Sequence, residues 1–132
     1  MTARMDSNFI NYVDFLEVTV EAYATAPKKL FSKMMRMIIN TLHQQASKIE
    51  KDALLVNGMN QFPIDDLEEF YDVILDKIDD IKLLKIKLEE FKDNDKLFSE
   101  LLEELTKLQN AYRLYMDRMG QLEVRLFSKK SA

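Results

Sequence analysis

Apolar residues recur at spacings of three and four over four segments of the chain, which is the pattern of amphipathic helices that pack into a core. This spacing predicts helices over about residues 7–25, 27–57, 65–92 and 95–127. The stripes that define them include Phe9, Val13, Leu16 and Val20 in the first segment, Phe31, Met35, Ile38 and Leu42 in the second, Leu67, Ile74, Ile81 and Leu88 in the third, and Leu101, Leu105, Leu108 and Tyr112 in the fourth.

Residues that begin or end helices fall between these segments. Pro27 fits the first turn of the second helix, and Gly58 is a stop signal after it. Asp65, with Glu68 three residues later, forms a capping box for the third helix. The polar break at 93–95 supplies caps for the end of the third helix and the start of the fourth.

The fourth segment is the most regular, because its apolar positions keep a seven-residue repeat over four heptads from Phe98 to Leu126. Such a repeat favours coiled-coil-like packing at about 20° to neighbouring helices. Short breaks after the first and third segments predict antiparallel neighbours. The longer connection at 57–64 suits neighbouring or diagonal helices. We therefore expect one all-α domain over residues 1–132, an up-and-down antiparallel four-helix bundle with a frayed tail after residue 127.

Composition removes several classes of function. The 132 residues include two glycines, two prolines and no cysteine. A glycine-rich phosphate loop, a thiolate nucleophile, a zinc finger and a disulfide framework are therefore excluded. Every stretch long enough to cross a membrane is interrupted by charge, so we expect no integral membrane segment. The first residues lack a signal-peptide pattern, which predicts a cytoplasmic location.

Charge is distributed unevenly around a net value of −4. Residues 27–57 hold six Lys and Arg against two Asp and Glu, whereas residues 58–93 hold five against eleven. An acidic chain with one short basic patch lacks the electrostatic footprint of a nucleic-acid-binding protein. Acidic residues of the third segment form a stripe opposite its apolar stripe, made of Asp65, Glu69, Asp72, Asp76 and Asp80. A solvated outer face is the usual meaning of such a stripe, and a cation site or a docking face for a basic partner is the alternative.

Residues with catalytic or metal-binding chemistry are sparse. His43 is the only histidine, and the sequence has no Glu-x-x-His pair, so multi-histidine and di-iron sites are excluded. The few serines lie near termini or caps, and spacing indicates no acidic partner for the histidine. We predict no catalytic, metal-binding or cofactor-binding residues and no bound cofactor.

Several residues outside the apolar stripes are candidates for contact with a partner. The start of the second helix is basic and rich in methionine, which suits a calmodulin-like groove or an anionic membrane surface. Methionines that fill the core of a deeply buried helix are the alternative interpretation. Off-stripe apolar residues, among them Val18, indicate a partner surface or self-association. The candidate partner-binding residues are Lys28, Lys29, Lys33, Met34, Arg36, Met37, Leu83, Ile86 and Leu114.

Arg36 and His43 are seven residues apart, which places both on one face of the second helix. This pair resembles the Arg-x4–6-His motif of HEPN-type ribonucleases, which are small all-helical proteins. The resemblance covers these two residues, and Met37 stands where a polar residue commonly follows the arginine. It implies a metal-independent ribonuclease of a toxin–antitoxin type system, in which His43 transfers protons and Arg36 stabilises phosphate charge.

The function expected from the remaining observations is non-catalytic. A small helical bundle without site chemistry and with surplus apolar residues suits binding to another protein, as an adaptor, regulator or chaperone-like partner, or to itself as a homo-oligomer. The alternatives are the HEPN-like ribonuclease and a bundle that contacts a membrane surface or a hydrophobic ligand through the basic helix 27–57.

Overall fold

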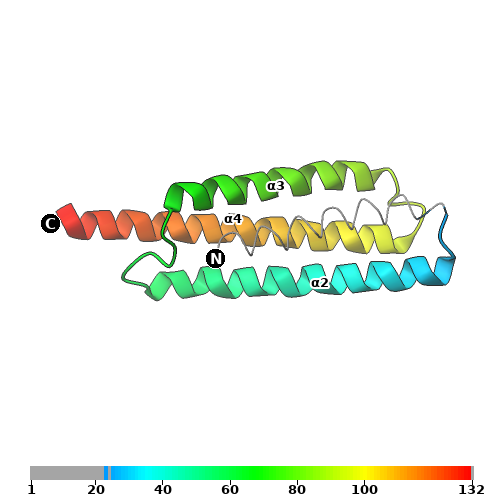
Figure 1. The fold of residues 1–132 in the computed structure, drawn as a ribbon, viewed down its shortest axis with the longest axis horizontal. Coiled ribbons are helices and arrows are strands. Elements are labelled where there is room, and N and C mark those ends of the chain that lie inside the picture. Colours follow the sequence, from blue (N-terminus) through cyan, green and yellow to red (C-terminus); the bar gives the residue numbers. More distant parts are fainter. Residues whose placement is uncertain (1–22, 24, 132) are drawn as a thin grey trace.

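The computed structural model describes residue 23 and residues 25–131, and this part of the chain is all-helical. Helix α2 spans Lys28–Leu55 and continues into a short 3-10 helix, η1, at Val56–Gly58. Helix α3 spans Leu67–Glu89 and helix α4 spans Lys96–Ser131 (Figure 1). Apart from residues 23 and 25, the helix expected over residues 7–25, which would be the fourth of the bundle, lies outside the described residues.

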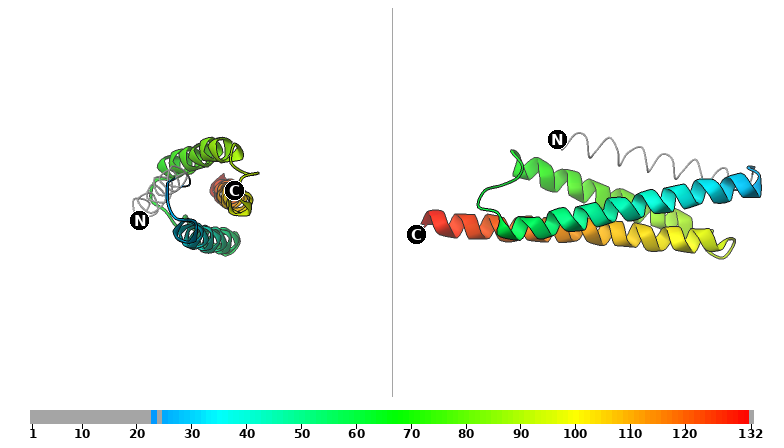
Figure 2. Two further views of the ribbon diagram at one scale, coloured as in Figure 1. Left: turned by 90° about the vertical axis from the view of Figure 1, so that its right-hand side faces the viewer. Right: turned by 90° about the horizontal axis from the view of Figure 1, so that it is seen from below.

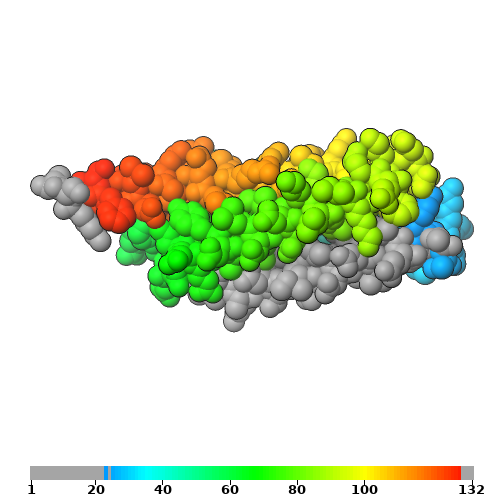
Figure 3. All heavy atoms as spheres, turned by 90° about the horizontal axis from the view of Figure 1, so that it is seen from above, coloured from blue at the N-terminus to red at the C-terminus, as the bar shows by residue number. Residues whose placement is uncertain are grey.

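Helices α2 and α4 lie side by side and run in the same direction (Figure 1). At one end the ring centroids of Phe31 and Phe98 are 5.6 Å apart, and at the other end Arg125 hydrogen-bonds to the carbonyl of Asn57. Helix α3 runs antiparallel to both, and Figure 3 shows it beside α4 along one face of the molecule. The short break between α3 and α4 thus joins antiparallel neighbours, whereas the largest interface is parallel.

Helices α2 and α3 both pack against α4 and, in the described part of the chain, do not pack against each other; in the end-on view they lie across from one another with α4 beside both (Figure 2). The connection between Gly58 and Leu67 therefore joins helices that are not neighbours. This is one of the two arrangements expected for the longer connection, and the three described helices alternate in direction, as in an up-and-down order. The physical reason is reach, because the eight connecting residues can extend to about 26 Å and carry the chain past α4.

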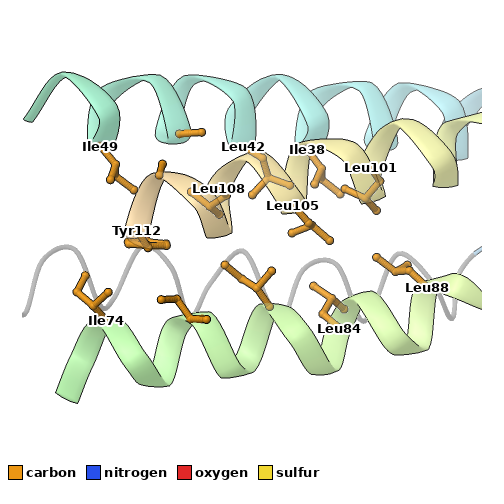
Figure 4. Packing of buried hydrophobic residues seen from close by; sticks show 14 of the residues in the cluster. Ile38, Leu42, Ile49, Ile74, Leu84, Leu88, Leu101, Leu105, Leu108 and Tyr112 are labelled. Atoms are coloured by element: carbon orange, nitrogen blue, oxygen red, sulfur yellow. The ribbon is translucent and has the colours of Figure 1, made fainter. Parts of the chain in front are cut away.

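The hydrophobic core follows the apolar stripe of α4, which receives side chains from α2 and from α3 (Figure 4). Burial of one large aliphatic side chain is worth about 1.5–3 kcal/mol, so this stripe dominates the stability of the described helices. Leu67, a predicted stripe residue, is only half-buried at the start of α3. The predicted stripe residues that are buried include Phe31, Met35, Ile38 and Leu42 in α2, Ile74, Ile81 and Leu88 in α3, and Phe98, Leu101, Leu105, Leu108 and Tyr112 in α4.

Carboxylate side chains cap the starts of α3 and α4. The N-cap of α3 is Asp66, whose side chain accepts a hydrogen bond from the backbone N–H of Glu69 at 3.0 Å. The capping box predicted from Asp65 is therefore wrong by one position, because the backbone at Asp66 is still extended, with φ −119° and ψ 100°. At α4 the side chain of Asp95 accepts from the N–H of Leu97 at 2.9 Å, in the polar break where caps were expected.

The ends of α2 are set by Pro27 and by a side chain of α4. Pro27 is the N-cap rather than a residue of the first turn, because its ψ of 140° is extended. At the other end η1 stops at Gly58 without a left-handed residue, since no described glycine has a positive φ. The guanidinium of Arg125 donates to the carbonyls of Asn57 and Met59 at 2.9 Å each. It thereby satisfies carbonyl groups that have no partner within the helix.

Helix α4 continues to Ser131, four residues beyond its predicted end at residue 127. The predicted frayed tail is therefore wrong for residues 128–131, because neither glycine nor proline follows Phe127 to end the helix. Gly120 interrupts the heptad pattern without ending the helix. Among the described residues, a Cβ at this position would meet the hydroxyl of Tyr71 at 3.7 Å, an ordinary contact.

Replacing Arg125 with alanine is expected to lower the free energy of unfolding by about 1–2 kcal/mol, because hydrogen bonds from a charged donor to three carbonyls are lost at a partly exposed site. Arg125→Lys is expected to recover only part of this loss, since one ammonium group cannot span the same carbonyls. Urea unfolding followed by circular dichroism measures the difference.

Arg113→Ala is the matched control for this experiment. Arg113 is exposed on the same helix and donates one hydrogen bond, of 3.4 Å, to Asn110, so its loss is expected to cost less than about 0.5 kcal/mol. Equal unfolding midpoints for the two alanine variants would show that Arg125 does not hold the end of α2 on α4.

Candidate interaction surfaces

The outward face of α2 combines exposed cations with exposed apolar side chains. Leu30 is 51 % exposed and Met37 is 62 % exposed, although both are large and apolar. Lys33 lies three residues after Leu30 and four before Met37, so these side chains follow one line along the helix, away from the buried Ile38. Met34 is half-buried. We define the outward face of α2 as the exposed residues Lys28, Lys29, Leu30, Lys33, Arg36 and Met37.

The cations of this face form no ion pair with another described residue. No Asp or Glu lies between Glu21 and Glu50 in the sequence, and none of the ion pairs formed among the described residues involves a cation of this face. Lys28 and Lys29 also lie in the first turn of α2, which contains no acidic residue. A cation at the electropositive end of a helix costs about 0.3–1 kcal/mol. Lys28 and Lys29 therefore do not stabilise the first turn of α2.

The outward face of α3 carries apolar side chains among acidic ones. Leu75, Leu83 and Ile86 are 47 %, 66 % and 60 % exposed. Asp72 and Asp79 are exposed at helical spacing from them. These five residues define the outward face of α3, which lies opposite the buried stripe of that helix. An apolar surface of this size on a polar helix is a candidate contact surface.

The predicted partner-binding residues do not gather into one surface. The basic and methionine-rich residues lie on α2, whereas Leu83 and Ile86 lie on α3, which does not pack against α2. Leu114 lies on α4 and is half-buried, so it belongs to neither outward face. Val18, the remaining off-stripe apolar residue, lies outside the described residues. The structure thus presents two separate faces rather than one combined site.

The acidic stripe of α3 is exposed along its length and is not arranged as a metal site. Burial, and then the charge of Asp76, raise the pKa of the Asp80 carboxyl above its usual value, and Asp79 adds to the repulsion. Within the described ranges, no group of three or more His, Asp or Glu side chains is placed to hold a metal ion. The exposed residues of the predicted stripe are Asp65, Glu69, Asp72, Asp76 and Asp80.

His43 has an acidic partner that its sequence neighbourhood does not reveal. Its Nδ1 lies 3.3 Å from a carboxylate oxygen of Glu104 on α4, and the same carboxylate accepts from the Nζ of Lys107 at 3.3 Å. Arg36 is exposed about 10.5 Å further along the axis of α2 and takes no part in this cluster. The structure therefore places a histidine–carboxylate pair, exposed at the histidine, at the junction of α2 and α4.

Two polar residues occupy the core side of their helices, which sequence analysis missed. Gln109 is 4 % exposed, and its amide donates to the carbonyl of Ile78 at 3.1 Å while its oxygen accepts from Lys85 at 3.2 Å. Lys77 is 3 % exposed. The signal lies in the spacing, because Lys77 follows the buried Ile74 by three residues and thus falls on the stripe itself.

Comparisons of the chain with protein-family models, with curated proteins and with solved structures find no match in any of the three. Across the described helices, none combines the length and the apolar character needed to cross a membrane.

Stability at alkaline pH is expected to depend on Tyr115, whose ring packs on Phe70 with centroids 5.0 Å apart. Burial and the nearby carboxylate of Asp52 raise the pKa of its hydroxyl. The folded chain therefore holds this proton more tightly than the unfolded chain, so the contribution to stability is complete below about pH 10 and is lost as pH rises through the folded-state pKa. We expect the urea midpoint to fall between about pH 8.5 and about pH 11, and to fall less in Tyr115→Phe.

Tyr71→Phe is a companion variant, since burial and the charge of Glu123 raise the pKa of Tyr71 as well. The double variant is expected to lose the least stability over the same pH interval. Identical losses in all four proteins would show that neither hydroxyl contributes to the alkaline limit.

Proposed function

We propose that this protein acts without catalysis, as a four-helix bundle with coiled-coil-like packing that binds another protein in the cytoplasm through the outward face of α2. The role suits an adaptor, a regulator or a chaperone-like partner, and self-association belongs to the same class of function. The observation that carries the proposal is the set of four cations beside Leu30 and Met37 that form no ion pair with another described residue.

Two features of this face are unfavourable in the free chain, its exposed apolar side chains and its cations at the start of α2. An acidic amphipathic partner would relieve both. Covering the exposed parts of Leu30 and Met37 contributes on the order of 1–2 kcal/mol each. Acidic side chains placed near Lys28 and Lys29 would also neutralise cations that oppose the dipole of α2. The partner expected from this chemistry is a helix with both apolar and acidic residues on one face.

A membrane surface is the weaker alternative. Most of the apolar stripe of α2, from Phe31 to Val56, is used in the core, so only Leu30 and Met37 remain on the basic segment to enter a lipid interface. Four cations contribute about 1 kcal/mol each at an anionic surface, which corresponds to a dissociation constant near about 1 mM. The same use of the stripe argues against insertion of α2 into a calmodulin-like groove, which would require α2 to leave the core.

The test compares three forms of the protein as bait in lysate from its own cells. Lys33→Glu combined with Arg36→Glu is expected to reduce the retained partner at least about tenfold, because the charge of the face is reversed. Lys96→Glu combined with Arg113→Glu is the matched control, since both residues are exposed on α4 and the net charge changes equally. The control is expected to retain the partner as the wild type does.

Two results would count against the proposal. One is a wild-type protein that retains no partner, and the other is equal retention by all three forms. Vesicles that contain anionic lipid form the second arm of the experiment, at low salt. Binding to them that is abolished only by the α2 double variant would favour the membrane alternative instead.

The ribonuclease alternative is favoured by one observation, the Glu104 carboxylate beside His43. A carboxylate at Nδ1 orients the imidazole and leaves Nε2 available for proton transfer. If this function holds, the wild-type chain cleaves a fluorescent RNA without added metal. His43→Ala is then expected to lower the rate at least about a hundredfold. Glu104→Gln is expected to lower it less. Intact RNA after incubation with the wild type would end this alternative.

A further inference from the structure

We propose that the outward face of α2 binds the outward face of α3 of a second copy of this chain, so that copies associate head to tail. This inference deepens the proposed function and rests on it, because both assign an acidic amphipathic partner to the same face of α2. The inference identifies that partner as a second copy of the chain.

The outward face of α2 continues as a seam along the whole helix. From Leu30, Lys33 and Met37 the line proceeds in seven-residue steps to Gln44 and Lys51, and all five side chains are exposed. Positions spaced in this way lie on one side of a helix, as the contact positions of a coiled coil do. The seam is about 32 Å long, and it carries cations and apolar residues without any carboxylate.

The outward face of α3 is a seam of the opposite charge. Asp72, Leu75, Asp79, Leu83 and Ile86 follow one another at spacings of three, four, four and three residues. They cover about 21 Å of the helix, which is long enough for three turns of contact. Apolar residues occur in both seams, and Asp72 and Asp79 are opposite in sign to Lys33 and Lys51. Lys82, exposed and seven residues after Leu75, is a cation on the otherwise acidic seam of α3.

The carboxylates of α3 repel one another within a single molecule. Asp72, Asp76 and Asp80 are spaced by four residues, and such like-charge pairs cost about 0.2–0.5 kcal/mol each. No ion pair among the described residues involves Asp72, Asp76 or Asp79. The raised pKa of Asp80, which follows from burial and from the charges of Asp76 and Asp79, reflects the same crowding. Lysines from a second copy would relieve this repulsion.

The two seams cannot meet within one molecule. Helices α2 and α3 each pack against α4 but, in the described part of the chain, not against each other (Figure 2), and the residues of both seams are exposed. A contact between unlike faces of two copies is heterologous, so it propagates into chains or closes into rings. One pair of helices over about three turns buries less than a standard interface of roughly 1,600 Å², so the association is expected to be weak and sensitive to salt.

Sedimentation velocity of the full chain tests the inference. At about 20 mM salt, where the screening length is roughly 20 Å, the weight-average mass is expected to rise about twofold or more between about 10 µM and about 1 mM protein. It is expected to return to that of the monomer at about 0.5 M salt.

Charge reversal on each seam identifies the contact. Lys33→Glu with Lys51→Glu, and separately Asp72→Lys with Asp79→Lys, are each expected to be monomeric when alone. An equimolar mixture of the two variants is expected to associate again, because the acidic α2 of one meets the basic α3 of the other. Arg113→Glu and Asp117→Lys make the same types of change on exposed positions of α4 and are expected to associate like the wild type. Association of the mixed variants also shows that both variants are folded.

A wild-type chain that stays monomeric under these conditions overturns the inference, and so does a mixture that fails to associate. Neither result decides the proposed function. That function is judged by whether the Lys33→Glu and Arg36→Glu variant fails to retain a partner protein that the wild type retains. Association of the wild type that persists in both seam variants would place the contact between copies elsewhere and would also overturn the inference.

Discussion

A single apolar stripe on α4 organises the described part of the protein, because two helices that do not touch each other both depend on it. Its buried residues from Phe98 to Leu122 belong to one core cluster with residues of α2 and of α3, and both helices pack against α4. This division of one helix between two partners fixes where α2 and α3 lie. It also leaves each of them with a face turned away from the core, so the two outward faces are a direct result of how α4 is packed.

The helices themselves were largely predictable, whereas their arrangement was not. Spacings of three and four identify which side of each helix is buried, and breaks near Pro27, Gly58 and Asp95 bracket the ends to within about four residues. Periodicity does not say which helix covers a given stripe, so the parallel contact between α2 and α4 had no signal in the sequence. The cap at Asp66 was missed by one position, because adjacent aspartates offer the same chemistry and only the backbone conformation chooses between them.

The exposed candidate residues could be predicted only on helices that bury a single face. Met37, Leu83 and Ile86 fall off their stripes and are exposed. Leu114 also falls off its stripe, but α4 has neighbours on two sides and buries a wider arc, so this residue is half-covered. The contact of His43 with Glu104 joins residues 61 positions apart on different helices, which no local pattern can reveal.

The parallel pairing of α2 with α4 also sets the order in which the chain can assemble. The hydrogen bond between Lys85 of α3 and Gln109 of α4 joins residues 24 positions apart, whereas the bond from Arg125 to Asn57 spans 68. Closing the longer loop costs more chain entropy, and this entropy is lost before the contacts form that offset it. The hairpin of α3 and α4 can therefore form from local contacts, and α2 has to find a stripe that is already half covered. We therefore expect α2 to dock after the hairpin of α3 and α4 has formed.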